Sequence, residues 1–261
     1  MTPASASDST PLERDARLVN ARHGVIRPGE IAIGVIVGRT AEFFDFFVYA
    51  IASVLVFPSL VFPFVDPVTG TLYSFALFSL AFIGRPIGTL LFTHIDRNHG
   101  RGVKLTIALF LLGGSTMAIA LLPSYNQVGP VVIWLLGLFR LMQGVALGGA
   151  WDGLPSLLAL NAPEGSRGWY SMIPQLGAPL GLAVAAALFA YFEALLIRED
   201  FISWGWRYPF FVALAINVVA LFARLRLVAT PEFQRLFESR ELQPSPPFET
   251  LYAEWRTILL G

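Results

Sequence analysis

Long apolar segments alternate with short polar ones along most of this chain. Six of them have close to the roughly 20 apolar residues that a helix needs to cross a bilayer. Connections such as PFVDPVTG and LPSYNQVG are short, which favours antiparallel neighbours in a compact bundle. The predicted membrane helices cover residues 31–58, 71–93, 104–122, 130–151, 168–194 and 203–224. The pattern therefore predicts an all-α membrane protein with six transmembrane helices.

The distribution of arginine and lysine predicts the orientation of this bundle, because the cytoplasmic segments of membrane proteins carry an excess of these residues. With both ends of the bundle inside the cell, thirteen basic residues lie on the cytoplasmic side and only Arg198 and Arg207 on the other. We therefore expect both termini to be cytoplasmic. The predicted organisation is a cytoplasmic tail over 1–29, a bundle over 30–227 and a cytoplasmic linker over 228–261, whose last residues, RTILLG, start a seventh apolar run.

The composition argues against several function classes. The 261 residues are 55% hydrophobic and 14% charged, and the 18 basic residues balance the 18 acidic ones. A chain without net positive charge gives no reason to expect nucleic acid as a partner. There is no cysteine, and the three histidines lie outside the predicted spans. Because H-E-x-x-H and G-x-S-x-G motifs are also absent from the sequence, we expect neither an enzyme, nor a metal site, nor a cofactor.

Two pairs of motifs indicate an internal repeat. GRPIG in the second span is matched by GAPLG in the fifth, and Arg39-x-x-Glu42 in the first span is matched by Arg140-x-x-Gln143 in the fourth. Spans one to three therefore resemble spans four to six in order. Units with an odd number of spans have opposite topologies, so the two units form an inverted repeat. The alternative is that these prolines and glycines serve helix packing alone.

Four charged residues lie near the middle of the predicted spans. Glu42 and Arg140 are each about 15 Å from the nearer end of their spans, at 1.5 Å per helical residue, and Arg85 has a similar depth. Asp45 lies one turn beyond Glu42 on the same helix face, which Tyr49 continues. Unpaired in lipid, these charges would cost on the order of 10 kcal/mol together. We therefore expect them to face one another or a polar cavity.

Two interpretations of these charges stay open at this point. A structural ion-pair network could lock the helices together. Alternatively, the charges could form a proton or solute site, since ionisable groups inside membranes usually mark transport pathways. The second interpretation is favoured for this reason.

Several stretches, taken in order, resemble the major facilitator superfamily and, within it, the metabolite:proton symporters. They are EFFDFFVYA, GRPIGTLLF, DRNHGR, RLMQGVALGGAW, APEGSRGWYSMIPQLGAPLG, WGWRYPF and ATPEF. Together they extend over residues 31–233, which is almost all of the predicted membrane part. The resemblance implies a twelve-helix transporter built from two six-helix halves around a central cavity. This chain would be the N-terminal half followed by the linker between the halves.

The resemblance also implies roles for individual residues. The residues implied in proton coupling are Asp45, Glu42 and Arg140. Candidates for binding an anionic solute, for which the planar guanidinium of arginine is well suited, are Arg85, Gln143, Tyr49 and Arg39. A cytoplasmic loop that would latch the two halves together contains Asp96, Arg97, Gly100 and Arg101.

This sequence departs from the pattern of the family at two places. In HIDRNHGR, Asp96 stands four residues before Gly100 instead of three, and Thr93 takes the place of a glycine, which puts the pairing role of Asp96 in doubt. The family's GGEWGG reads GGAWDG here, so that an alanine replaces the acid and Asp152 follows two residues later. Because two residues rotate a helical side chain by about 200°, Asp152 is either a new partner or a solvated helix end, and the second interpretation is favoured.

The function predicted from these features is that of an N-terminal half of a proton-coupled secondary transporter. Its solute would be a small organic molecule, a carboxylate by the arginine argument, moved by alternating access. The partners would be the solute, protons, the lipid bilayer, and either a C-terminal six-helix half or a second copy of the chain. The location would be the inner membrane of a bacterium. The alternative is a truncated six-helix membrane fragment without transport activity of its own.

Overall fold

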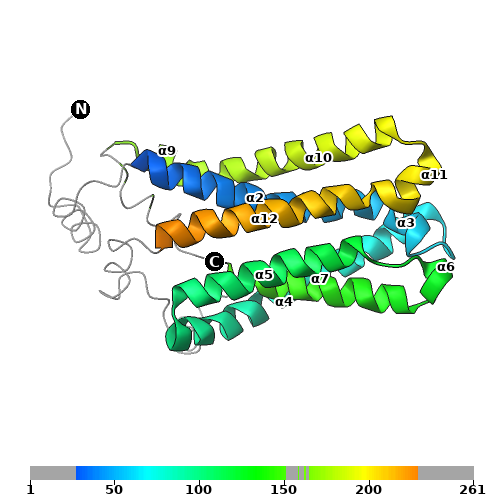
Figure 1. Cartoon of the computed structure of the whole chain (residues 1–261), viewed down its shortest axis with the longest axis horizontal. Helices are drawn as coiled ribbons and strands as arrows, with labels where there is room; N and C mark the ends of the chain where they lie inside the picture. Colours follow the sequence, from blue (N-terminus) through cyan, green and yellow to red (C-terminus); the bar gives the residue numbers. More distant parts are fainter. Residues whose placement is uncertain (1–27, 151–157, 159–161, 163–164, 229–261) are drawn as a thin grey trace, which may run out of the picture.

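The computed structural model describes residues 28–150, 158, 162 and 165–228, and these form a bundle of helices (Figure 1). Six long helices lie side by side in the described part, joined by short helical turns. The long helices are α2 (Pro28–Leu55), α4 (Pro67–His99), α5 (Arg101–Ala120), α7 (Val131–Gly149), α10 (Gly177–Leu195) and α12 (Arg207–Val228). The short α-helices are α3 (Phe57–Leu60), α6 (Tyr125–Val128), α9 (Arg167–Met172) and α11 (Arg198–Asp200). A 3-10 turn over Ile173–Leu176 precedes α10, and a π-helical turn over Phe201–Gly205 precedes α12.

Among the described residues, five helical segments are long and apolar enough to cross a membrane. They overlap with α4, α5, α7, α10 and α12. The remaining long helix, α2, has 28 residues and carries Arg39, Glu42 and Asp45, so that every stretch of it long enough to cross a membrane contains at least three charged residues. The concentration of charged residues within a predicted span thus distinguishes α2 from the other five long helices. The prediction of an all-α membrane bundle is confirmed.

Helix α4 is longer than the predicted second span. It begins where Asp66 accepts a hydrogen bond from the backbone N–H of Thr69 at 3.0 Å, and it continues through Pro86 to His99. The residues after 93 that were predicted to be a loop therefore form the last turns of this helix. The reversal takes place at Gly100, whose φ of +84° is accessible at low cost only to glycine.

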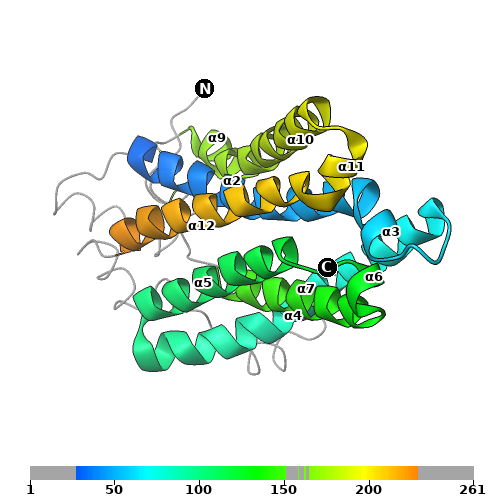
Figure 2. The same ribbon diagram turned by 45° about the vertical axis from the view of Figure 1, so that its right-hand side comes forward.

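The two predicted three-helix units pack as an inverted repeat. Helix α2 packs against α10 and α12, while its counterpart α7 packs against α4 and α5. The third helices of the two units, α5 and α12, pack against each other. The helices therefore form two layers, which Figure 2 shows: one contains α2, α10 and α12, and the other contains α7, α4 and α5. Exchanging the two three-helix units exchanges these two layers. Helix α2 begins and α12 ends at the same end of the bundle, opposite α3, α6 and α11 (Figure 1).

The repeated GRPIG and GAPLG motifs are the places where these layers' helices approach most closely. A Cβ atom added to Gly88 would lie 2.7 Å from the carbonyl carbon of Val145 on α7. In the second unit, a Cβ added to Gly181 would lie 2.8 Å from the backbone nitrogen of Phe44 on α2. Both distances are well below the 3.5–4.0 Å of an ordinary carbon contact. The repeat and helix packing are therefore compatible explanations of these motifs, because each motif provides the glycine of an equivalent helix contact.

Candidate functional site

A polar cluster lies inside the bundle, between its apolar helices. Its members share a side chain that is at least 96% buried and hydrogen bonds to at least one other member. They are Asp45 on α2, Thr116 on α5, Arg140 and Gln143 on α7, and Asn217 on α12. Burying such groups in a bilayer is tolerable only when they satisfy one another, so this cluster fixes four helices against each other.

The carboxylate of Asp45 is held by neutral partners. Asn217 donates from Nδ2 to Asp45 Oδ2 at 2.5 Å, and Thr116 Oγ1 lies at hydrogen-bond distance, 3.1 Å, from Asp45 Oδ1. The two partners come from α12 and α5, the equivalent helices of the two repeat units. No arginine or lysine of the described residues lies within ion-pair distance of Asp45.

The guanidinium of Arg140 is held differently. It donates from Nη1 to Gln143 Oε1 at 2.9 Å and from Nε to the carbonyl oxygen of Phe78 at 3.2 Å. Its Cζ also lies 4.4 Å from the ring centre of Tyr49 and 4.2 Å from that of Phe78. Cation–π contacts of this kind stabilise a desolvated cation by up to about 2 kcal/mol each. Nη2 has no partner among the described residues.

A chain of hydrogen bonds connects the acid to the base. Gln143 accepts from Arg140 and donates from Nε2 to Thr116 Oγ1 at 2.7 Å, and Thr116 is in turn the neighbour of Asp45. The expected direct meeting of carboxylates and guanidinium groups does not occur here. Instead, one amide and one hydroxyl separate the charge on α2 from that on α7.

The other predicted charges line a separate pocket of about 370 Å³, the charged pocket. Arg39 donates from Nη1 to Glu42 Oε2 at 2.8 Å, and Arg85 projects an exposed side chain from α4. The residues that line the charged pocket are Arg39, Glu42, Arg85, Thr89, Phe92, Thr93, Lys104, Leu147 and Gly148. Asp45 and Glu42 share one helix, but the first belongs to the polar cluster and the second to the charged pocket.

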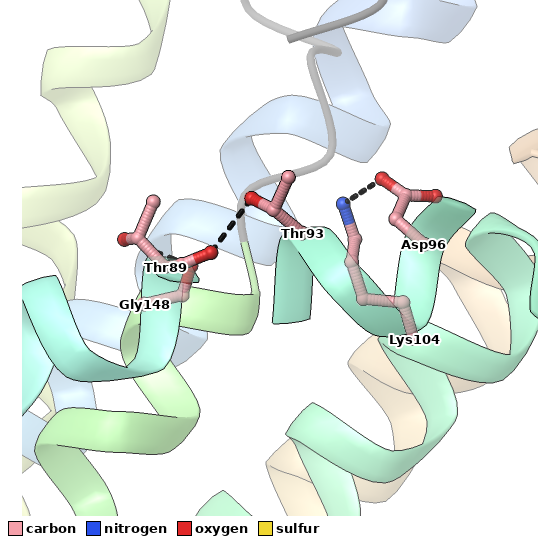
Figure 3. A network of polar contacts seen from close by, with 5 residues as sticks. All are labelled: Thr89, Thr93, Asp96, Lys104 and Gly148. Atoms are coloured by element: carbon pink, nitrogen blue, oxygen red, sulfur yellow. Dashed lines mark hydrogen bonds and ion pairs between the residues drawn. The ribbon is translucent and has the colours of Figure 1, made fainter. Parts of the chain in front are cut away.

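The predicted latch residues lie where α4 turns into α5. Asp96 is buried and accepts from Lys104 Nζ at 2.7 Å, as Figure 3 shows. Arg97 is exposed on the last turn of α4, Gly100 makes the reversal, and Arg101 is the first residue of α5. The shifted position of Asp96 thus still gives it an ionic partner in the described structure. Asp152 lies outside the described residues.

Sequence reasoning missed two members of the polar cluster and one cation of the charged pocket. Thr116 and Asn217 are the partners of Asp45, yet neither belongs to a motif. Asn217 had a signal, because it is the one asparagine within the six predicted spans, and a buried amide in a membrane demands a partner. Lys104 was treated as a topology signal, although its position at the start of a span also lets it reach the pocket.

Comparison with known proteins identifies the family. The family model described as "Sugar (and other) transporter" matches residues 31–244. The chain belongs to this family. The inner membrane metabolite transport protein YhjE of Escherichia coli (strain K12) is 38% identical over 249 residues, which is 95% of this chain and 55% of that protein. The shikimate transporter of the same organism is 34% identical over 209 residues, 80% of this chain and 48% of that one.

Solved structures show the same fold. The proton:xylose symporter XylE bound to 6-bromo-6-deoxy-D-glucose, a member of the major facilitator superfamily, is similar with a TM-score of 0.62 at 21% sequence identity. The match covers 83% of this chain and 47% of XylE. The chain therefore spans about half the length of the relatives it matches, and its six helices correspond to the N-terminal half of a major facilitator transporter. These relatives are named as transport proteins.

Proposed function

We propose that this chain forms half of a proton-coupled secondary transporter for a small organic carboxylate, working by alternating access. The observation that carries the proposal is the hydrogen-bonded chain from Asp45 through Thr116 and Gln143 to Arg140. In this chain, one carboxylate and one guanidinium are buried inside the bundle without a direct ion pair. Protonation of Asp45 would rearrange the hydroxyl and the amide that connect it to Arg140, which couples the proton to the packing of α5 and α7.

The charged pocket supports the choice of an anionic solute. It contains Arg39, Arg85 and Lys104 against Glu42 as its only acid among the lining residues. Guanidinium groups bind carboxylates through two parallel hydrogen bonds. Charged side chains on this face cannot face lipid at acceptable cost, so the face belongs to a polar cavity, which the other half of the transporter or a second copy would close.

The test is proton-linked uptake in membrane vesicles from cells that express the gene. We expect Asp45→Asn to remove the dependence of uptake on a pH gradient while the protein still inserts and folds, because asparagine has the size of aspartate and its side-chain oxygen still accepts a hydrogen bond, but it takes up no proton. Leu109→Ile, a conservative change in a buried apolar position of α5, is the control. Unchanged pH-dependent uptake in Asp45→Asn would refute the assigned role. No uptake by any form would favour the alternative, a fragment without activity of its own.

We also propose that both ends of the bundle are cytoplasmic and that the membrane is the bacterial inner membrane. The absence of cysteine from the sequence makes the test simple, because single cysteines can be introduced without a background. Asn126 on α6 and Asn98 near the end of α4 lie at opposite ends of the bundle and are both exposed. In intact spheroplasts, a membrane-impermeant maleimide should label Asn126→Cys and not Asn98→Cys. The reverse labelling would invert the orientation.

A further inference from the structure

Among the described residues, the charged pocket has one positive charge without a carboxylate partner. Arg39 pairs with Glu42 at 2.8 Å, and Lys104 pairs with Asp96 at 2.7 Å. Arg85 has no ion pair or side-chain hydrogen bond among the described residues, and its side chain is exposed to the pocket. In the described structure the pocket therefore offers a ligand one uncompensated cation.

Two hydroxyl groups beside Arg85 offer acceptors. Thr89 Oγ1 donates to the backbone carbonyl of Arg85 at 3.1 Å, and the backbone carbonyl of Gly148 lies 3.4 Å from the same oxygen. Thr93 Oγ1 donates to the backbone carbonyl of Thr89 at 2.7 Å (Figure 3). A threonine hydroxyl has one proton and two lone pairs. Because these protons are already used, both oxygens are left to accept hydrogen bonds from a ligand.

The rest of the wall sets the size and the shape of the ligand. Phe92 and Leu147 supply apolar surface, and Gly148 brings the backbone of α7 close to the pocket. The volume of about 370 Å³ is at the lower end of the range of small-molecule sites, roughly 300–1,000 Å³. A compact molecule the size of a single ring fits this space.

We propose that the charged pocket selects a hydroxylated monocarboxylate, with the carboxylate on Arg85 and a hydroxyl donating to Thr89 or Thr93. The proposal rests on the proposed function for the role of this ligand as the transported solute. It narrows the solute class in two ways. A second carboxylate finds no further uncompensated cation and meets Glu42, and a ligand without a hydroxyl leaves the threonine acceptors unused.

The test is direct binding to the chain in lipid nanodiscs, measured by calorimetry with three probes that differ at one ring position. The probes are benzoate, 3-hydroxybenzoate and benzene-1,3-dicarboxylate. A neutral hydrogen bond contributes about 0.5–1.5 kcal/mol, so 3-hydroxybenzoate should bind about 2- to 12-fold more tightly than benzoate. The dicarboxylate should bind no more tightly than benzoate. Tightest binding by the dicarboxylate, or equal binding of the two monocarboxylates, would overturn the proposal.

Variants test the contact of the carboxylate and the contact of the hydroxyl separately. Arg85→Gln should weaken all three probes about tenfold or more, because hydrogen bonds to charged groups contribute about 1.5–3 kcal/mol. The double variant Thr89→Val with Thr93→Val should remove the preference for the hydroxyl and leave benzoate unchanged. Thr71→Val is the matched control, since Thr71 makes the same kind of bond, to the carbonyl of Pro67, at the other end of α4.

The binding assay keeps this proposal distinct from the transport proposal. Probe preferences as expected, without any proton-linked uptake, would leave the ligand class standing and remove the coupling. Proton-linked uptake with no effect of Arg85→Gln or of the threonine variants on binding would support the coupling and refute the ligand class. A preference for the hydroxylated probe that survives in the double threonine variant would place its origin outside this pocket and overturn the assignment.

Discussion

The contact between α4 and α7 predicts that the bundle is destabilised by a single methyl group at Gly88. A Cβ atom there would lie 2.7 Å and 2.8 Å from the carbonyl carbon and Cα of Val145, and closer still to its carbonyl oxygen. All three are backbone atoms, so no side-chain rotation can make room. To reach an ordinary contact distance of about 3.5–4.0 Å, the two helices would have to move apart by about 1 Å or more.

The size of the effect follows from what this separation disturbs. Overpacking of a well-packed interior costs about 1–3 kcal/mol, and a backbone clash should lie at the upper end of this range for Gly88→Ala. At Gly181 the nearest atoms would be 2.8 Å and 2.9 Å away and include the Cβ of Phe43, so Gly181→Ala should cost less. Gly114 on α5 is the control, because a Cβ there would meet nothing within 4 Å. Alanine favours a helix over glycine by up to about 1 kcal/mol, so Gly114→Ala should be neutral or stabilising.

The measurement is unfolding of each purified variant in mixed micelles by titration with sodium dodecyl sulfate, followed by circular dichroism. Stability should decrease in the order Gly114→Ala, Gly181→Ala, Gly88→Ala, with the wild type near the first of these. A Gly88→Ala protein as stable as the wild type would refute the close approach of α4 and α7. Larger destabilisation by Gly114→Ala than by Gly88→Ala would refute the packing argument as a whole.

Two further predictions concern polar contacts at the ends of α4. Lys104→Met leaves the buried carboxylate of Asp96 without its cation, and loss of one partner of a buried pair costs about 3–5 kcal/mol. Adding Asp96→Asn should recover part of this loss of stability in the same titration. No recovery would contradict the pairing. At the other end, the hydrogen bonds from Thr69 hold the pKa of Asp66 below its ordinary value. The charged cap therefore stabilises the first turn at neutral pH and is lost as the pH falls through that lowered pKa. In the wild type, protection of this turn against amide hydrogen exchange should decrease on acidification. In Asp66→Ala, protection should be low at every pH. Equal protection in the two proteins would exclude the cap.

The sequence was sufficient for the fold because membrane spans are a matter of length and composition. Five of the long helices satisfy both, and the motif pairs predicted the repeat whose helix contacts the structure shows. The boundaries were less accurate. Helix α4 extends to His99, since nothing in HIDRNH interrupts a helix once polar residues have left the membrane. Hydropathy reports where a helix is in lipid and not where its hydrogen bonds end.

The candidate site was predictable by residue type but not by partner. Depth estimates correctly put Asp45 and Arg140 inside the bundle, yet they could not show that α5 and α12 provide the partners of Asp45. Depth is a coordinate along one axis, whereas pairing depends on the rotation of each helix about its own axis. Arg85 illustrates this, because it shares the depth of the cluster but is exposed at the charged pocket.

The choice of partners for Asp45 has a consequence for proton coupling. A direct ion pair with Arg140 would favour the charged carboxylate and oppose its protonation. Threonine and asparagine, in contrast, each carry both a donor and an acceptor. A rotated hydroxyl at Thr116 or a turned amide at Asn217 can therefore serve the carboxylate and the carboxylic acid alike, with small movements of buried atoms. Under the proposed function, the proton-binding residue exists in both protonation states and needs such partners, so we propose Asp45, more than Glu42 beside Arg39, as the residue that exchanges the proton.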